Sequence, residues 1–298
     1  MGSKQLLKSL GMLASLLVIL ACGLASTPAP QVGSLGTVVS ATLQALTAAV
    51  PASTQAAQSI GIPVSFQNVS FVIPGGLALS ASSKVIPNNP TDQTGGPWAV
   101  APQHLEFTLN GYNLPPGYFQ QILIDIYPAQ EYAKVYDGAN ISLQHLQAFL
   151  ASPAMPISSD TLPQVPYFNA AAMFNAQVKV VHFKNGTGVG MVTQYGQAVG
   201  PIVNSGTFYN FEGLTSDGKY FLVVVLPVEA PFLLNGNDPS APLPAGGIPF
   251  PDYNSKDAKV FDNYYKAITD KMNATDANSF QPSLNSLDAL VQSINISQ

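Results

Sequence analysis

Few side chains of this chain could do acid–base chemistry, and the two best placed are carboxylates inside apolar segments. Glu106 lies in a predicted strand, His104–Asn110, and Asp125 lies in the next, Ile122–Tyr127. A pair of carboxyl groups can act as general acid and base, as in glycoside hydrolysis. An interior position would raise the pKa of Asp125. The alternation of this residue with isoleucines favours the other interpretation, a side chain that points into water.

The remaining candidates for catalysis or metal binding do not form a motif. His104, His145 and His182 lack the spacing of a metal-binding pair, and the flanking pattern at His182 predicts a solvated side chain. No GxSxG segment marks a nucleophile, although a dispersed Ser/His/Asp set stays open because its members need not be close in sequence. The oxygen-rich segment Asn235–Asp238 lacks the ligand spacing of a calcium loop and predicts a turn. We therefore expect no metal and no cofactor.

Tyrosines are the strongest candidates for binding a ligand. Four tyrosines lie between two predicted strands or shortly after the second: Tyr112, Tyr118, Tyr132 and Tyr136. Exposed tyrosines on loops can form a patch that binds a sugar or a peptide. The interpretation that these rings pack in the core and at its rim is favoured, because aromatic residues are also the main core material of this chain.

The charge pattern excludes one class of partner. The chain has no arginine, and its 11 lysines stand against 16 acidic residues, a net charge of −5. Nucleic-acid binding depends on Lys and Arg contacts with phosphate, so we expect no nucleic-acid partner.

The N-terminal segment is typical of an export signal. Lys4 and Lys8 precede an apolar run, Leu10–Ala21, which is shorter than the about 20 residues that span a bilayer. The run ends at Cys22, the one cysteine of the chain, so disulfides and cysteine metal sites are excluded. Residues 22–60 are uncharged and rich in Ala, Ser, Thr and Pro, which predicts a flexible tether, with a short helix over Val38–Val50 as the alternative.

The rest of the chain, residues 61–298, predicts a single α+β domain. The segment 178–184 leads through Asn185-Gly186 into 189–195, and the segment 206–211 pairs with 220–226, so two hairpins are expected. The fully apolar strand Phe221–Leu226 should be central and buried on both faces. A short hairpin or one bulged strand is expected at 64–71, and a long loop at 80–102. The expected helices are 142–151, 256–272 and 282–294. This order predicts an antiparallel sheet with helices packed on it.

Two resemblances extend this interpretation. The sequence Ile19-Leu20-Ala21-Cys22 resembles the lipobox of bacterial lipoproteins, which implies cleavage of residues 1–21 and attachment of a lipid to Cys22. Leu20 departs from the small residue that is commoner there. The stretch from Tyr195 to Val228 and the ending Leu284–Ser293 resemble a group of uncharacterised bacterial surface lipoproteins with no assigned activity. The order of elements is also similar to the PsbP/Mog1-type α/β/α sandwich, a likeness of architecture that does not give function.

Together these features predict a protein anchored in the cell membrane through Cys22 and facing outside the cytoplasm. The expected function is a non-catalytic binding or scaffold module whose partner is an envelope protein or glycan. The alternative is a hydrolase of envelope or extracellular polymers that uses carboxylates or a dispersed Ser/His/Asp set. The absence of a recognisable catalytic motif favours the first.

Overall fold

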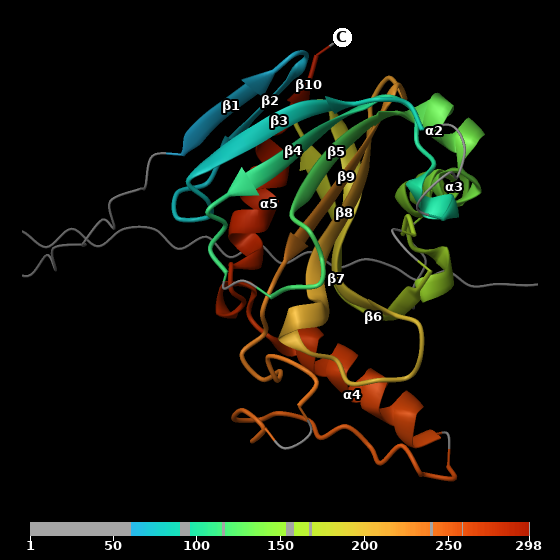
Figure 1. Ribbon diagram of the computed structural model, residues 1–298, viewed down its shortest axis with the longest axis vertical. Helices are drawn as coiled ribbons and strands as arrows, with labels where there is room; N and C mark the ends of the chain where they lie inside the picture. The colour runs from blue at the N-terminus through green and yellow to red at the C-terminus, as the bar shows by residue number, and fades with distance from the viewer. Residues whose placement is uncertain are drawn as a thin grey trace, which may run out of the picture. The chain divides into compact units, whose positions relative to one another are not determined.

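Seven antiparallel strands form the main sheet of the molecule (Figure 1). The computed structural model describes residues 61–89, 96–114, 117–152, 158–166, 169–238, 241–257 and 259–297. In sheet order the strands are β3 (Ser80–Ile86), β4 (His104–Asn110), β5 (Leu123–Pro128), β9 (Tyr220–Pro227), β8 (Thr207–Thr215), β7 (Gly186–Gly196) and β6 (Ala171–Phe183). The predicted antiparallel α+β fold is confirmed, and so are both long hairpins. The leader, the tether with its alternative helix, and Cys22 lie outside the described residues.

The strand predicted to be central is the middle strand of this sheet. Each residue of β9 from Phe221 to Pro227 is buried, because layers cover both faces of the sheet. One layer contains α2 (Ala129–Val135) and α3 (Asp137–Ala151). The other contains α4 (Lys259–Ala274), α5 (Leu284–Ser293) and a small sheet of β1 (Ile62–Phe66), β2 (Val69–Ile73) and β10 (Asn295–Ile296). Each face of the sheet therefore has its own apolar core.

Two sequence interpretations of individual segments were wrong. The long loop expected over 80–102 contains β3, a strand whose residues are mostly exposed and which pairs with β4 along its whole length. The pattern of β3 is rich in serine, so it carries no apolar alternation that would mark a strand. The predicted helix 142–151 begins earlier, at Asp137, and the separate helix α2 precedes it.

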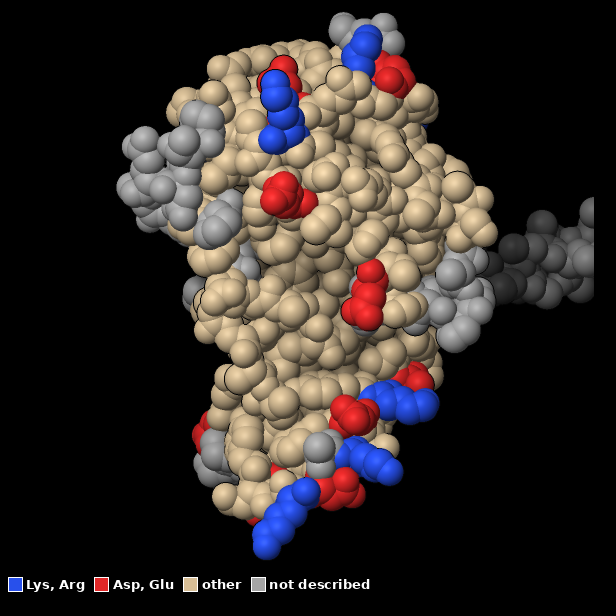
Figure 2. Space-filling model, turned by 90° about the vertical axis from the view of Figure 1, so that its right-hand side faces the viewer, with Lys and Arg blue, Asp and Glu red and all other residues tan. Residues whose placement is uncertain are grey.

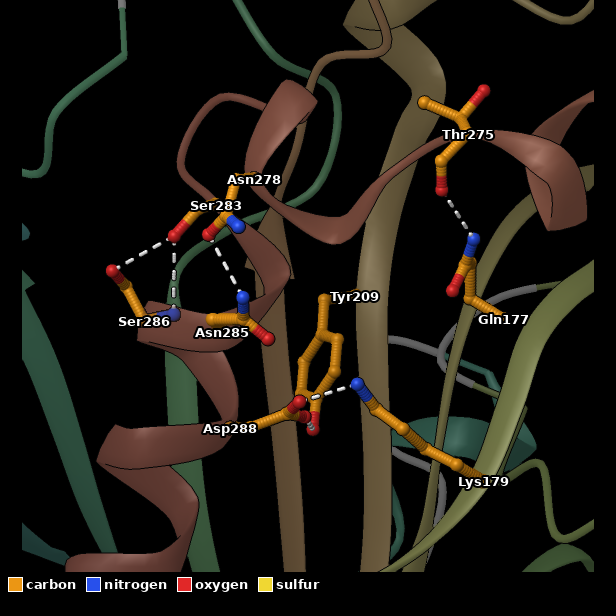
Figure 3. A network of polar contacts seen from close by, with 9 residues as sticks. All are labelled: Gln177, Lys179, Tyr209, Thr275, Asn278, Ser283, Asn285, Ser286 and Asp288. Carbon is orange, nitrogen blue, oxygen red and sulfur yellow. Dashed lines mark hydrogen bonds and ion pairs between the residues drawn. The ribbon is translucent and has the colours of Figure 1, made fainter.

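A bulge in β6 ties the C-terminal helices to the sheet (Figure 3). At this register shift Gln177 adopts a positive φ of 55°, and its side-chain amide donates to the carbonyl oxygens of Met272 (2.7 Å) and Thr275 (3.0 Å). Both acceptors lie at or just beyond the C-terminal end of α4, where the regular pattern of helical backbone hydrogen bonds stops. Ser283 caps the start of α5 by accepting a bond from the amide of Ser286. The helices are thus fixed at defined places beside β6.

Candidate functional site

The four candidate tyrosines do not share one surface. Tyr112 and Tyr118 lie in the connection between β4 and β5, and both line one cavity. Tyr132 is a buried residue of α2 and stacks on Tyr127 with ring centroids 4.1 Å apart. Tyr136 is half-buried, and its hydroxyl donates to the carbonyl oxygen of Pro166. The structure therefore divides the candidates into a cavity pair and a pair that packs α2 against the sheet.

The cavity at Tyr112 and Tyr118, here called the tyrosine cavity, has a volume of about 540 Å³. This is within the size range of small-molecule sites. Its described walls carry amide, hydroxyl and apolar groups but no charged side chain. They are formed by Thr108, Leu109, Gly111, Tyr112, Leu114, Gly117, Tyr118, Gln120, Gln121, Ile122 and Pro227. Such a lining suits an uncharged ligand with several hydroxyl groups.

Hydrogen bonds from distant segments hold this cavity open. The hydroxyl of Tyr118 donates to Glu229, and the amide of Phe119 donates to the carbonyl oxygen of Ser205 (3.0 Å). The backbone of Glu229 is itself paired with that of Gln281. Burial, with the nearby Glu229 carboxylate, raises the pKa of Tyr118 well above its usual value, so its hydroxyl remains a donor. The phenol of Tyr112 donates to the carbonyl oxygen of Pro227 (3.0 Å).

The two predicted carboxylates are neighbours in one row across the sheet. Asp125 pairs with Glu106 on one side and with Val223 on the other, and Val223 pairs with Glu212. Lys84 lies at the edge of this row and forms an ion pair of 2.7 Å with Glu106. Residues of one row point to the same face of a sheet. The row therefore runs beneath the layer of α2 and α3.

The expectation that Asp125 points into water was wrong. Its side chain faces the interior, because α2 covers the face that the alternating pattern assigned to solvent. The phenol of Tyr127 donates to its Oδ2 (3.0 Å), while Oδ1 has no partner among the described residues. The ring of Tyr127 lies between those of His104 and Tyr132, and the centroids of the His104 and Tyr127 rings are 4.3 Å apart. These three rings shield the carboxyl group of Asp125 from water. Burial raises the pKa of Asp125 to about 7.

A second buried acid, Glu212, was not recognised in the sequence. Its carboxyl group accepts bonds from the hydroxyl of Ser142 in α3, from the amide of Val165 (2.6 Å) and from the side chain of Asn210. Burial raises its pKa to about 7, although these three donors oppose the shift. The available signal was the position of Glu212 beside the fully apolar strand β9, since neighbours of a central strand are also covered on both faces.

Of the candidate histidines, His104 lies beside the two predicted acids, because it packs on Tyr127, the partner of Asp125, and is near Glu106. Five cavities in the described part of the chain lack Glu106, Asp125 and Glu212 in their walls, while His104 lines one of the five. His145 contacts the carbonyl oxygen of Leu162, and His182 is exposed, as predicted, beside Thr187. General acid–base catalysis requires contact with a substrate within hydrogen-bond reach. The geometry of these groups is that of sheet packing.

A second cavity, of about 440 Å³, is formed mainly by the segment after β9 and is here called the proline cavity. Its described walls are Pro201, Leu234, Gly236, Asn237, Asp238, Ala241, Leu243, Pro249, Phe250, Pro251, Asp252 and Tyr253. The sequence segment tested for calcium binding lies in this wall. The described residues contain no group of three or more His, Cys, Asp or Glu side chains placed to hold a metal ion.

One further polar network lies beneath α5 (Figure 3). Asp288 receives the ammonium group of Lys179 from β6 and the hydroxyl of Tyr209 from β8 (2.9 Å). All three groups point toward one another in Figure 3, so each satisfies another's charge or hydrogen bond. The network docks α5 on the sheet.

Charged groups are sparse on the side of the molecule that carries α2 and α3. Figure 2 shows this side as largely uncharged, with acidic and basic side chains alternating along its lower edge, where α4 lies. Within the described part of the chain, no helix combines the length and the apolar character needed to cross a membrane.

Comparison with protein-family models, with curated proteins and with solved structures finds no match for this chain. The resemblance to bacterial surface lipoproteins accordingly rests on the sequence motifs alone.

Proposed function

We propose that this chain is a lipid-anchored binding protein on the extracytoplasmic side of the cell membrane, and that it holds an uncharged envelope glycan in the tyrosine cavity. The observation that carries the binding role is the cavity itself, preformed and lined by amides and hydroxyls. Hydroxyl-rich sugars match this lining because side-chain amides such as those of Gln120 and Gln121 can both donate to and accept from sugar hydroxyls.

The anchoring role is supported by the position of Cys22 directly after the apolar leader. A diacylglyceryl group on this sulfur would hold the chain at the membrane, because each buried methylene contributes about 0.8 kcal/mol. Radioactive palmitate should label the wild-type chain and not Cys22→Ala in the native host. Equal labelling of both would refute lipidation at this residue.

The binding role is tested with the full-length protein in detergent and a panel of soluble envelope glycan fragments. Gln121→Ala removes an exposed amide from the cavity wall and should weaken binding by about tenfold, the effect of one lost hydrogen bond of about 1.4 kcal/mol. Tyr118→Ala, which removes the largest side-chain contact at the mouth of the β4–β5 connection together with its bond to Glu229, should weaken binding further.

The matched control is Gln130→Ala, which removes an equally exposed amide from α2, on the opposite layer. It should leave the affinity unchanged. If no fragment of the panel binds, or if Gln121→Ala and Gln130→Ala bind equally well, the glycan proposal is wrong. The hydrolase alternative has less support, since Glu106, Asp125 and Glu212 line neither the tyrosine cavity nor the other four cavities compared with it.

A further inference from the structure

The proline cavity is a second preformed cavity, and it differs from the tyrosine cavity in its lining residues and in its chemistry. About two thirds of its wall residues are apolar, and the two charged wall residues, Asp238 and Asp252, are both acidic. No lysine lies among its described wall residues, and the chain has no arginine. A cavity with this lining favours a positively charged group over a neutral or anionic one.

Contacts with α4 and with Asn204 and Ser205, in the turn just before β8, fix the walls of this cavity. Phe250 packs edge-to-face on Tyr264 with ring centroids 5.0 Å apart, and it also contacts Phe261. The amides of Asn204 and Ser205 donate to the carbonyl oxygens of Leu234 (2.8 Å) and Asn235 (2.9 Å). These bonds and the restricted φ of the wall prolines keep the cavity preformed, which lowers the entropy lost on binding.

Tyr253 presents an aromatic ring at this cavity. It is 65% exposed although it lines the wall, and its ring centroid lies 5.0 Å from that of Phe250. An exposed tyrosine face attracts a cation through the ring quadrupole. The adjacent Asp252 uses Oδ1 to accept bonds from the backbone and side chain of Asn254. Among the described residues no donor reaches its Oδ2, so this oxygen is available to a ligand.

We propose that the proline cavity binds a small organic cation, an alkylammonium ion whose charge lies between Tyr253 and the carboxylates of Asp252 and Asp238 while its alkyl groups contact the prolines, Leu243 and Phe250. The volume of about 440 Å³ fits a small solute. The site does not depend on the glycan proposal, because it shares no wall residue with the tyrosine cavity.

The test uses the full-length protein and choline as the probe, with 3,3-dimethylbutan-1-ol as its neutral isostere. Calorimetric titration should detect choline at millimolar concentration and should give at least tenfold weaker binding of the neutral alcohol. Tyr253→Leu should weaken choline binding by about fivefold, and Asp252→Asn, which keeps an acceptor for Asn254, by a similar factor.

The matched control is Asp270→Asn, which removes a carboxylate of α4 that is 62% exposed and lies outside the cavity wall. It should leave choline binding unchanged, and thermal melting should show that all variants are folded. Absence of choline binding at millimolar concentration, equal binding of the neutral alcohol, or wild-type affinity in both cavity variants would each overturn the proposal.

Discussion

Asp125 and Glu212 occupy equivalent places on either side of Val223, one in the β5 half of the sheet and one in the β8 half. Both are buried and both have a pKa raised to about 7. Glu212 receives donors from α3, from the segment at Val165 and from its own strand, whereas Asp125 receives only the phenol of Tyr127 and keeps one oxygen without a partner among the described residues.

The difference indicates that equal burial does not imply equal roles. Glu212 connects three elements, so its carboxyl group is an organising centre for the α3 side of the sheet. The hydrogen bond of Asp125 joins two residues of the same strand, β5, because its partner Tyr127 lies two residues away. A buried polar group with an incomplete set of partners lowers stability, so Asp125 should contribute less to the stability of the fold than Glu212 does. The following changes test this contrast, from the largest expected effect to the smallest.

Glu212→Ala should cause the largest loss of stability. It leaves Ser142 and the amide of Val165 without an acceptor inside the protein and creates a cavity. We expect the free energy of unfolding to fall by about 4 kcal/mol, measured by urea denaturation at pH 6.

Glu212→Gln is the control, because its amide oxygen can still accept from Val165 and it keeps the volume. It should lower the free energy of unfolding by about 1 kcal/mol. If alanine and glutamine have the same effect, the hydrogen bonds to Glu212 do not organise this side of the sheet.

The pH dependence of stability comes next in size. In the unfolded chain both acids ionise near pH 4, whereas in the folded chain they remain protonated up to about pH 7. The folded state therefore binds more protons in this window, and the free energy of unfolding falls as the pH rises from about 4 to 7. Between pH 5 and pH 8 the loss should be about 2 to 3 kcal/mol for each of the two acids, measured by urea denaturation.

Asp125→Asn should reduce that pH-dependent loss, because one of the two groups no longer titrates. An unchanged profile in this variant would show that Asp125 ionises normally. A wild-type stability that rises over the same window would contradict the burial of both acids.

Asp125→Asn at pH 8 should itself have a small effect of the opposite sign. The asparagine oxygen can still accept from Tyr127, while the charge that would be buried at this pH is removed. We expect the free energy of unfolding to rise by about 1 kcal/mol, since ionised buried groups with few partners are unfavourable. A loss of stability of similar size would mean that the carboxylate has a favourable partner in solution.

The contrast between the two acids also shows which features a sequence can predict. The hairpins could be predicted because Asn185-Gly186 and Ser216–Gly218 are local turn signals. The burial of Asp125 could not be predicted from alternation, since that pattern cannot distinguish a solvated face from one covered by a helix. The covering helix α2 has only seven residues and was not itself predicted.

The candidate sites were predictable to a smaller extent. The pair Tyr112 and Tyr118 lies at a cavity, but Tyr132 and Tyr136 belong to the layer of α2 and α3 on the other face of the sheet. This division depends on how β5 joins α2. The proline cavity brings Pro201 beside residues 234–253, and contacts between such distant segments leave no periodic signal in a sequence.

Lys266→Ala should have the smallest effect and sets the lower end of the comparison. Its ion pair with Asp270 joins side chains that are 73% and 62% exposed, so water already solvates both charges. Such pairs one helical turn apart contribute about 0.3–0.5 kcal/mol, and alanine regains a similar amount through its higher helix propensity. Thermal melting should therefore give a free energy of unfolding within about 0.5 kcal/mol of wild type. A loss as large as that of Glu212→Ala would mean that the exposure of a charged group does not predict how much it contributes to the free energy of unfolding of this protein.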